Sequence, residues 1–376
     1  MKKLHYEQSG DNYKLKDPFK VIALKATRKT INNSKRFIKY GLNISDIPGS
    51  RGESAYRMSF KSDKPIEFQF AHVEESIGTK NIIADELIKE FGKSYYYNIA
   101  IDNVASIVND LSTCGAFPLS FMLHLAAYPN EWYLDENIIE PLLEGTAHAC
   151  NLAGLTWGGG ESATDRDIIE KGRAMLSGSA TGIIYPSTNV LSEDKIEIGD
   201  RIVIFESSGV HTNGITLLRK ELLKKLPQGY KTKLSDGTTY GEALMTPSII
   251  YAKLVEEILI KSEIHYSVII TGHGWRKFMR SNRQLTYDIE QIPPAQPIFD
   301  LIKKYSGSND RDMYDTYNMG AGFAVFAPAE QVKTIQKIAK KLGIASYDAG
   351  SVKKGAKKLI INPLNLEFTQ ADMTIR

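Results

Sequence analysis

The pattern of apolar and polar residues in the first half of the chain switches between helical and strand-like spacing. Residues 80–91 place their apolar side chains three or four positions apart, which predicts an amphipathic helix. The same spacing predicts helices over residues 98–111 and 137–152, with Gly154 ending the second. Continuous or alternating apolar runs instead predict strands at residues 66–73, 119–127 and 175–184.

The helix predicted over residues 98–111 has a polar face beside its apolar stripe. At about 100° per residue, Asp102, Ser106 and Asn109 fall together, with Asp110 at the edge of the group. Such a face is usually the solvated side of a helix. Here it carries short acids and amides rather than Lys and Glu, and this favours a ligand site.

The pattern starts afresh after a polar connection over residues 185–199. An apolar run at residues 201–205 predicts a strand, and the apolar spacing that ends at Pro227 predicts the helix behind it. Because both halves alternate strands and helices, we predict an α/β fold of two mixed layers, with domains at residues 1–190 and 191–376. Further helices are predicted at residues 247–261 and 329–342, and further strands at 267–270, 322–326 and 358–361.

Composition narrows the class of protein. Hydrophobic residues make up 42% of the 376 positions and charged residues 24%, as in ordinary globular proteins. The net charge of +3 shows no clustered basic surplus, so we expect no nucleic-acid partner, and the lysine pairs at 353–354 and 357–358 are expected to be solvated loop ends. No stretch approaches the roughly 18 apolar residues of a membrane span, so no membrane partner is expected. Two cysteines, Cys114 and Cys150, are too few for a disulfide framework and favour the cytoplasm.

The common nucleotide and zinc motifs are missing from the sequence. It has no Gly-x-x-x-x-Gly-Lys-Ser/Thr loop and no convincing dinucleotide-binding fingerprint. Its seven histidines and two cysteines do not pair at zinc-ligand spacing. Four other polar clusters therefore carry the candidate chemistry.

The first cluster is the run 74–80, where a predicted strand ends in Glu74 and Glu75. Gly78 permits close backbone approach, and Lys80 opens the next helix. Carboxylates suit Mg²⁺ and an ammonium suits polyphosphate, so the run fits a metal–nucleotide site. The alternative is a plain helix start with glutamates at its positive end.

The second and third clusters each add oxygen ligands at the end of an element. They are Asn109-Asp110 on the helix described above and the run 159–162, which reads Gly-Gly-Glu-Ser and includes Glu161. Each is weak alone, because similar runs occur in plain turns.

The fourth cluster is the run 207–214, in which a buried strand leads into hydroxyls, a glycine and a helix start. Such a turn offers free N–H groups to a phosphate. His211 within it is either a proton donor or acceptor near neutral pH or a structural histidine. The runs 270–274 and 315–322 repeat the join of a strand to a glycine-rich turn.

In chain order these clusters resemble the aminoimidazole ribonucleotide synthetase family, the phosphoribosylformylglycinamidine cyclo-ligases. The resemblance runs from about Glu74 to Val352 and rests on seven ordered motifs. They are Glu74–Lys80, Val108–Asp110 with Gly115–Leu119, Gly159–Ser162, Ser207–Gly214, Met245–Tyr251, Ile269–Gly274 and Thr316–Gly322.

The resemblance implies a PurM-like fold of two α/β domains, in which N-terminal domains pair into a dimeric β-barrel and the C-terminal domain is layered. It implies a homodimer that uses ATP and Mg²⁺ and acts on formylglycinamidine ribonucleotide. ATP would activate the formyl amide oxygen as an iminophosphate, the amine would attack, and phosphate would leave as the imidazole ring closes.

The resemblance also implies roles for individual residues. The catalytic group would be His211, Lys80 and Glu75, and the metal ligands Glu75, Asp110 and Glu161. The cofactor contacts would be Gly78, Thr79, Asp102, Asn109, Asp110 and Glu161. The substrate or phosphate contacts would be Ser207, Ser208, Gly209, Asn213, Thr271, Gly272 and Asn318.

The first two departures from the family pattern concern acids. Glu75 stands where the family has an aspartate; it is one methylene longer, and this should keep metal binding but shift its geometry. A second family aspartate is replaced by Leu123 or by its neighbour His124.

The other two departures concern a histidine and a loop. Ile269 stands where the family has a histidine, and His265 and His273 are the nearby candidates to substitute for it. The loop 48–53, expected to order on demand, carries Arg51 where the family is mostly small and neutral.

Two alternatives remain open from the sequence. One is another ATP-using member of the superfamily that acts on a different small substrate. A selenophosphate synthetase would need a cysteine before Cys114, and the short thiamine-monophosphate kinases lack the run around His211 in this form. The other is a catalytically silent nucleotide-binding dimer, which fits the changes at Leu123 and Ile269 but not the retention of Lys80.

Overall fold

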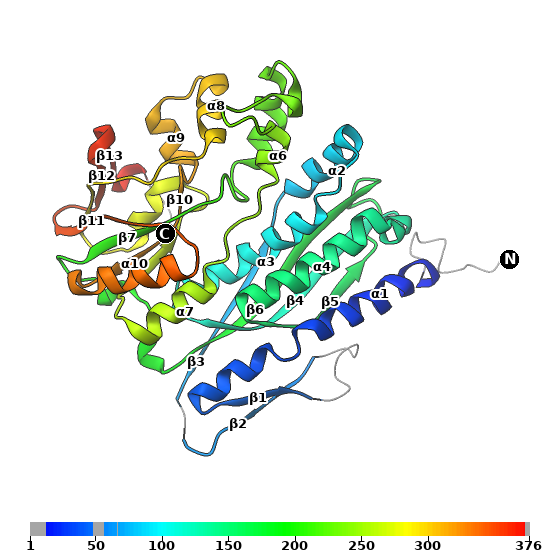
Figure 1. The fold of residues 1–376 in the computed structure, drawn as a ribbon, viewed down its shortest axis with the longest axis horizontal. Helices are drawn as coiled ribbons and strands as arrows, with labels where there is room; N and C mark the ends of the chain where they lie inside the picture. Colours follow the sequence, from blue (N-terminus) through cyan, green and yellow to red (C-terminus); the bar gives the residue numbers. More distant parts are fainter. Residues whose placement is uncertain (1–12, 48–55, 66, 373–376) are drawn as a thin grey trace. The chain divides into compact units, whose positions relative to one another are not determined.

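The computed structural model describes residues 13–47, 56–65 and 67–372 of the chain, which divides into two compact units (Figure 1). Unit 1 comprises the described residues up to 111 together with 117–186, and unit 2 comprises 112–116 and the described residues from 187 onward. The division after Pro186 falls inside the polar connection at 185–199, four residues before the predicted boundary. The short segment 112–116 belongs to unit 2 although it lies within the first half of the sequence.

Unit 1 is built on a four-stranded sheet in the order β3-β6-β4-β5. Three of these strands are antiparallel neighbours, and β5 pairs parallel with β4. Side chains alternate between the faces, so Phe121, Leu123 and Leu125 of β4 are buried on one face. The strands are β3 (Gln69–Ser76), β4 (Phe117–Tyr128), β5 (Thr156–Ala163) and β6 (Arg173–Ile184).

The helices of unit 1 pack on this sheet through their apolar sides. In α3 the side chains of Val104, Val108 and Leu111 are fully buried, as the apolar stripe predicts. The helix α1 packs along β5 and against α4. The elements are α1 (Tyr13–Thr27), α2 (Lys80–Phe91), α3 (Tyr96–Ser112) and α4 (Glu136–Ala153), with a small hairpin of β1 (Asn43–Asp46) and β2 (Met58–Lys61).

Unit 2 is built on a seven-stranded sheet in the order β13-β12-β9-β11-β7-β10-β8. All neighbours are antiparallel except β12 and β9. The strands are β7 (Arg201–Glu206), β8 (Tyr266–Ile269), β9 (Leu285–Ile289), β10 (Ala321–Ala327), β11 (Ser346–Lys354), β12 (Lys358–Ile361) and β13 (Leu366–Thr369).

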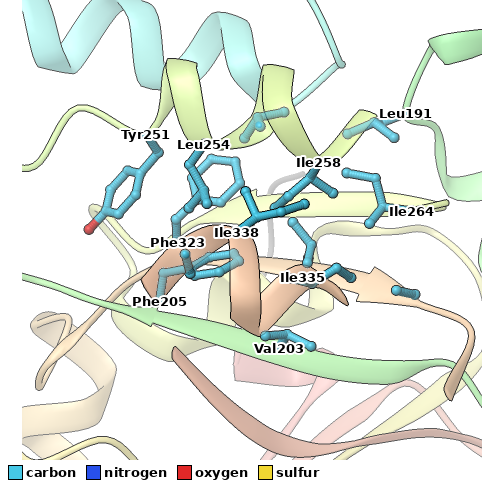
Figure 2. Close-up of a cluster of buried hydrophobic side chains, with 14 of the residues drawn as sticks. Leu191, Val203, Phe205, Tyr251, Leu254, Ile258, Ile264, Phe323, Ile335 and Ile338 are labelled. Atoms are coloured by element: carbon cyan, nitrogen blue, oxygen red, sulfur yellow. The ribbon is translucent and has the colours of Figure 1, made fainter. Parts of the chain in front are cut away.

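Two helices, α7 (Ala252–Lys261) and α10 (Val332–Lys341), cover one face of this sheet. Figure 2 shows their apolar side chains, among them Leu254, Ile258 and Ile335, packed against Phe205 and Phe323 of the strands. The burial of these side chains holds β7, β10 and β8 in place, and the candidate site lies at one end of those three strands. The other helices are α5 (Ile215–Leu217), α6 (Tyr240–Leu244), α8 (Pro297–Ser306) and α9 (Asp310–Thr316).

Several sequence predictions about elements are confirmed, and others need correction. The helix at residues 80–91 and the strand at 358–361 have the predicted bounds. The helix predicted from residue 247 begins at Ala252, because residues 246–251 run without regular structure beside the loop after β7, where the Pro247 carbonyl accepts a hydrogen bond from Ser208. The lysine pair at 353–354, expected in a loop, ends strand β11 and is exposed there.

The loop 48–53 with Arg51 lies outside the described residues. Among the helices of the described residues, none has the length and apolar character needed to cross a membrane.

Candidate functional site

Three loops meet at one end of the unit 2 sheet. Strand β7 ends at Glu206 and pairs with the start of β10, where Ala321 lies opposite Glu206. Strand β8 ends at Ile269, opposite Phe323 on the other side of β10. The register therefore brings the runs after β7, after β8 and before β10 to the same edge of the sheet.

Asn318 connects two of these loops from a buried position. Its side-chain oxygen accepts hydrogen bonds from Ser207 Oγ at 2.9 Å and from the Gly320 N–H at 3.1 Å. Its side-chain nitrogen donates to the Gly209 carbonyl at 2.8 Å. Ser207 and Asn318 are 1% and 2% exposed, so these two predicted substrate residues use their polar atoms to shape the loops.

His211 lies in the middle of the first loop in a left-handed conformation, with φ 55°. Its Nε2 accepts a hydrogen bond from the Ser208 N–H at 3.2 Å, so in the neutral ring the proton is on Nδ1. Gly322 of β10 makes room for the ring: a Cβ there would lie 3.1 Å from His211 Cε1 and 1.8 Å from the Tyr251 hydroxyl. The imidazole is thus packed against the strand edge, with 4% of the residue exposed.

Tyr251 is a site residue for which the sequence predicted no role. Its hydroxyl donates to the Glu206 carbonyl at 2.6 Å, at the end of β7. Burial raises the pKa of the Tyr251 phenol, so the group stays protonated and acts as a hydrogen-bond donor. Its place at the end of a motif that matched the family was the available signal.

Asn213 and Gly272 bring the loop after β8 against the loop after β7. A Cβ on Gly272 would lie 3.8 Å from the side-chain oxygen of Asn213. The side-chain nitrogen of Asn213 is buried and has no hydrogen-bond partner among the described residues. Thr271 is half-buried, and its carbonyl accepts from the Gly274 N–H at 2.9 Å, which closes the turn.

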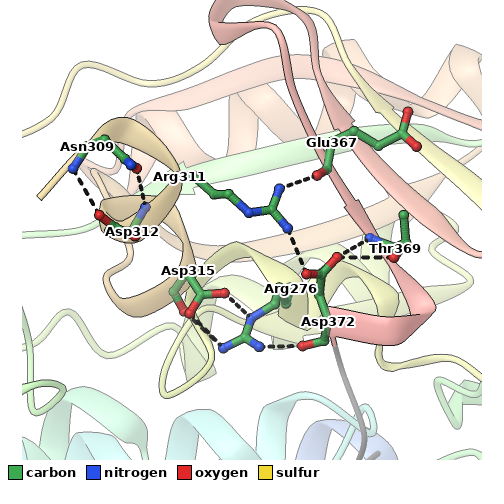
Figure 3. A network of polar contacts seen from close by, with 8 residues as sticks. All are labelled: Arg276, Asn309, Arg311, Asp312, Asp315, Glu367, Thr369 and Asp372. Atoms are coloured by element: carbon green, nitrogen blue, oxygen red, sulfur yellow. Dashed lines mark hydrogen bonds and ion pairs between the residues drawn. The ribbon is translucent and has the colours of Figure 1, made fainter.

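A network of arginines and carboxylates stabilises the segments after β8 and before β10 (Figure 3). Arg276, which follows the 271–274 turn, forms an ion pair with Asp315 at 2.8 Å. Arg276 also donates to the Asp372 carbonyl, and Arg311 forms an ion pair with the Asp372 carboxylate at 2.7 Å. The C-terminal segment is therefore tied to the loop after β8 and to α9.

The structure corrects one candidate for the missing family histidine. His265 precedes β8, at the opposite end of this strand from the candidate site, and its Nδ1 lies 3.0 Å from the Asp200 carboxylate. Ile269 itself is 3% exposed and belongs to the same hydrophobic cluster as Leu254 and Phe323. His273 is the histidine that remains near the site.

In unit 1 the structure brings two predicted cofactor residues into direct contact. Lys80, at the start of α2, and Asp102 of α3 form an ion pair of 2.6 Å, and both side chains are completely buried. Asn109 is 1% exposed and Ser106 half-buried, so the polar face of this helix is not its solvated side. Lys80 is neutralised by Asp102 and is not presented at the surface.

The three predicted metal ligands are not brought together. Glu75 lies on β3 and Glu161 on β5, the two outer strands of the unit 1 sheet, and both are exposed. Three strand spacings separate them, about 14 Å. Among the described residues there is no group of three His, Cys, Asp or Glu side chains that could hold a metal ion. Glu75, Asp110 and Glu161 therefore do not form a ready-made ion site.

A cavity of about 400 Å³ lies between α1, β4 and β5 in unit 1. The run 158–162, including Glu161, forms one wall, and Leu123 lies beside it. Apolar side chains of α1, among them Phe19 and Leu24, form the opposite wall. This wall could not be predicted from the sequence, because the first sixty residues show only short helical patterns.

Comparison with protein families gives two matches. Residues 73–184 match the model described as "AIR synthase related protein, N-terminal domain". Residues 197–362 match "AIR synthase related protein, C-terminal domain". Together they span most of the chain.

Several curated relatives carry the same name, phosphoribosylformylglycinamidine cyclo-ligase. The relative from Pyrococcus horikoshii is 31% identical over 337 residues, which is 89% of this chain and 93% of that protein. The relative from Methanocaldococcus jannaschii is 34% identical over 280 residues, 74% of this chain and 76% of that protein.

Solved structures with a similar fold have lower sequence identity. A hydrogenase maturation protein HypE in complex with ATP has a TM-score of 0.57 at 16% identity, covering 84% of this chain and 87% of that one. A thiamine-monophosphate kinase from Stenotrophomonas maltophilia has a TM-score of 0.57 at 17% identity, covering 85% and 92%. T. maritima PurL complexed with AMPPCP has a TM-score of 0.51 at 15% identity, covering 92% and 49%. These likenesses establish the two-domain fold.

Proposed function

Since the chain belongs to the AIR synthase related family, we propose that it is an ATP-dependent phosphoribosylformylglycinamidine cyclo-ligase of purine biosynthesis. Its reaction closes the imidazole ring of aminoimidazole ribonucleotide from formylglycinamidine ribonucleotide. The observation that carries this proposal is the match to the Pyrococcus horikoshii cyclo-ligase over 93% of that protein's length. The loops around His211, Gly272 and Asn318, which meet at one sheet edge, support it.

The reaction needs an activated amide oxygen and a path for protons. ATP transfers its γ-phosphoryl group to the formyl amide oxygen, the amine attacks the resulting iminophosphate carbon, and phosphate leaves. The neutral His211 ring can donate a hydrogen bond from Nδ1 while Nε2 accepts one from the Ser208 N–H. To accept a proton at Nε2, the imidazole must first break its hydrogen bond with the Ser208 N–H, and the loop after β7 then loses this restraint.

ATP and Mg²⁺ are proposed as the cofactors. The fold neighbours HypE and PurL were solved with ATP and with AMPPCP, and this supports a nucleotide in a protein of this fold. The separation of Glu75 from Glu161 means that these two carboxylates would not reach the same ion, so phosphate oxygens would supply most of its ligands. The cavity beside Glu161 and the end of β3 beside Glu75 are the two candidate places.

A homodimer is proposed as the working assembly. Strand β3 lies at the edge of the unit 1 sheet and is exposed along most of its length. Phe70 of β3 is 59% exposed and Phe60 of β2 is 39% exposed, and their rings lie 6.0 Å apart. An exposed edge strand that carries an aromatic side chain favours pairing with another chain. We also propose a cytoplasmic location, in agreement with the free thiols of Cys114 and Cys150.

The test is a reaction with purified protein, Mg²⁺, ATP and formylglycinamidine ribonucleotide. We expect release of phosphate and formation of a diazotisable aminoimidazole product, with both depending on the ribonucleotide. ATP hydrolysis without the aminoimidazole would reject the cyclo-ligase proposal. Incubation with thiamine monophosphate in place of the ribonucleotide is the control for the kinase relatives.

A further inference from the structure

The segment 366–372 lies beyond the part of the chain that matches the family models. The match to the C-terminal model ends at residue 362. Strand β13 pairs antiparallel with β12, and a short 3₁₀ turn over Gln370–Asp372 follows it. The segment therefore extends the unit 2 sheet by one strand and a turn that the family pattern does not include.

Asp372 is the residue through which this segment is held on α9 (Figure 3). Its carboxylate accepts hydrogen bonds from the Thr369 N–H and from Arg311, both at 2.7 Å. The bond from the Thr369 N–H, followed by that from Arg311, holds the pKa of Asp372 below its usual value, so the group is charged at neutral pH. The Arg311 guanidinium also lies 4.6 Å from the centre of the Phe368 ring. The segment is thus docked on the first turn of α9.

Asp372 also reaches the loop after β8, through its backbone. The Asp372 carbonyl accepts a hydrogen bond from Arg276, which follows Gly274 by two residues. The same guanidinium forms an ion pair with Asp315, near the end of α9, at 2.8 Å. The Arg276 side chain is 16% exposed, so water screens this pair less than a surface pair. Arg276 therefore joins three parts of unit 2: the segment 366–372, the loop after β8, and α9.

The two loops joined in this way carry predicted substrate contacts. Gly272 lies in the loop after β8, and Asn318 lies in the loop between α9 and β10. The Trp275 indole N–H donates to the Asn318 carbonyl at 2.7 Å. A Cβ on Gly274 would lie 2.2 Å from a backbone oxygen of α9, so the two backbones are in contact. An anchor on Arg276 and on α9 therefore sets the position of both loops.

We propose that Asp372 is a positioning residue, which holds the loops after β8 and before β10 in the arrangement that binds the ribonucleotide. This inference rests on the proposed function, because it takes the ribonucleotide as the ligand of these loops. The carboxylate fixes the turn over 370–372 through Thr369 and Arg311, and the turn presents its carbonyl to Arg276. Loss of the carboxylate leaves every proposed substrate contact in the chain but frees the loops that carry them.

The kinetic test is Asp372→Ala, which removes the carboxylate. We expect the KM for formylglycinamidine ribonucleotide to rise about tenfold, since a displacement of about 1 Å caused by a remote substitution can cost up to about a hundredfold. The KM for ATP should not change, because the ATP contacts are proposed in unit 1. A simple loss of folded protein would lower the amount of active enzyme and leave both KM values as they are. Asp372→Asn keeps an acceptor for the Thr369 N–H and should fall between the two proteins.

Glu367→Gln is the matched control in the same hairpin. The Glu367 carboxylate forms an ion pair with Lys358 at 3.1 Å, and the substitution removes it. The Glu367 carbonyl, which accepts a hydrogen bond from Arg311, stays in place. This variant should keep the KM of the natural chain. An equal rise in Glu367→Gln and Asp372→Ala would trace the effect to lost surface charge and overturn the inference.

Hydrogen exchange of the ligand-free protein separates this inference from the proposed reaction. The Gly274 N–H is bonded to the Thr271 carbonyl and the Ala321 N–H to the Asn318 carbonyl, both at 2.9 Å. In Asp372→Ala these two amides should exchange about fivefold faster, the change expected for the loss of one partly exposed ion pair. Unchanged exchange would overturn the inference even if the natural chain makes aminoimidazole. Faster exchange in a protein that makes no aminoimidazole would instead reject the reaction and support the positioning role.

Discussion

The left-handed turn at His211 allows its imidazole to be removed without losing the loop. Asparagine adopts this conformation more readily than most residues, so His211→Asn should preserve the path between Ser208 and Asn213. General acid–base groups contribute roughly a hundredfold or more to rate, and we expect kcat to fall by at least that factor. The KM for ATP should stay the same, and steady-state kinetics with each substrate varied in turn will measure both values.

His148→Asn, at an exposed position on α4, is the control. An unchanged kcat in His211→Asn would remove this imidazole from the mechanism.

The buried pair of His265 and Asp200 predicts how stability depends on pH. Burial lowers the pKa of His265, but the hydrogen bond and charge of Asp200 outweigh it and the net pKa is raised. Burial raises the pKa of Asp200 as well. A group whose pKa is higher in the folded protein stabilises it below the unfolded pKa and loses this contribution as pH rises through the folded value. For the histidine this loss begins above about pH 6.5.

We therefore expect the free energy of unfolding to decrease from pH 6 to pH 8.5 by more in the natural chain than in His265→Gln. Urea unfolding at several pH values, followed by circular dichroism, measures the difference. His273→Gln, which changes an exposed histidine, is the control and should leave the slope unchanged. Parallel slopes in the natural chain and His265→Gln would show that the pair does not titrate with folding.

At the scale of elements, most of the amphipathic helices could be predicted from the sequence, but strands that contain charged residues could not. The helix at residues 80–91 was predictable because its apolar side chains repeat at helical spacing. Strands β9 and β11 were missed because they contain polar residues such as Asp288 and Lys353, which pair with each other only in the folded sheet. The burial of Lys80 with Asp102 was also hidden, since the sequence shows a lysine but not the partner that neutralises it.

The contact between α3 and α4 gives a test at the same scale. Gly145 of α4 faces α3 so closely that a Cβ would lie 2.4 Å from the Tyr97 carbonyl. Backbone cannot move aside as a flexible side chain can, so Gly145→Ala should destabilise unit 1 by about 1–3 kcal/mol, although alanine is the better helix former. Chemical denaturation measures the loss. Glu140→Ala, at an exposed position of the same helix, should change stability little, and an equal effect of both variants would contradict the close contact.

At the scale of the whole molecule, the order of the motifs predicted the family but not the way in which the chain divides. The boundary was placed in the polar connection because apolar spacing restarts there. The transfer of residues 112–116 to unit 2 could not be predicted, since it depends on contacts such as the hydrogen bond from Ser267 to the Thr113 carbonyl at 3.0 Å. The predicted metal ligands show the same limit: strand order places Glu75 and Glu161 on the two outer strands of the unit 1 sheet, and the sequence alone does not show this order.

The proposed dimer is the property of the whole molecule that a single substitution can test. Phe70 lies on the edge strand β3, and its ring is 5.0 Å from that of Phe68, so a partner chain would bury an aromatic group at this edge. Phe70→Glu places a charge there, and burying an unpaired carboxylate is costly enough to prevent association. Light scattering after gel filtration should give twice the chain mass of 42.0 kDa for the natural protein and a single chain mass for Phe70→Glu. Ile168→Glu is the matched control, because Ile168 is 81% exposed but lies outside the strands of the sheet. A natural chain that runs as a monomer, or a Phe70→Glu variant that keeps the double mass, would exclude β3 as the dimer interface.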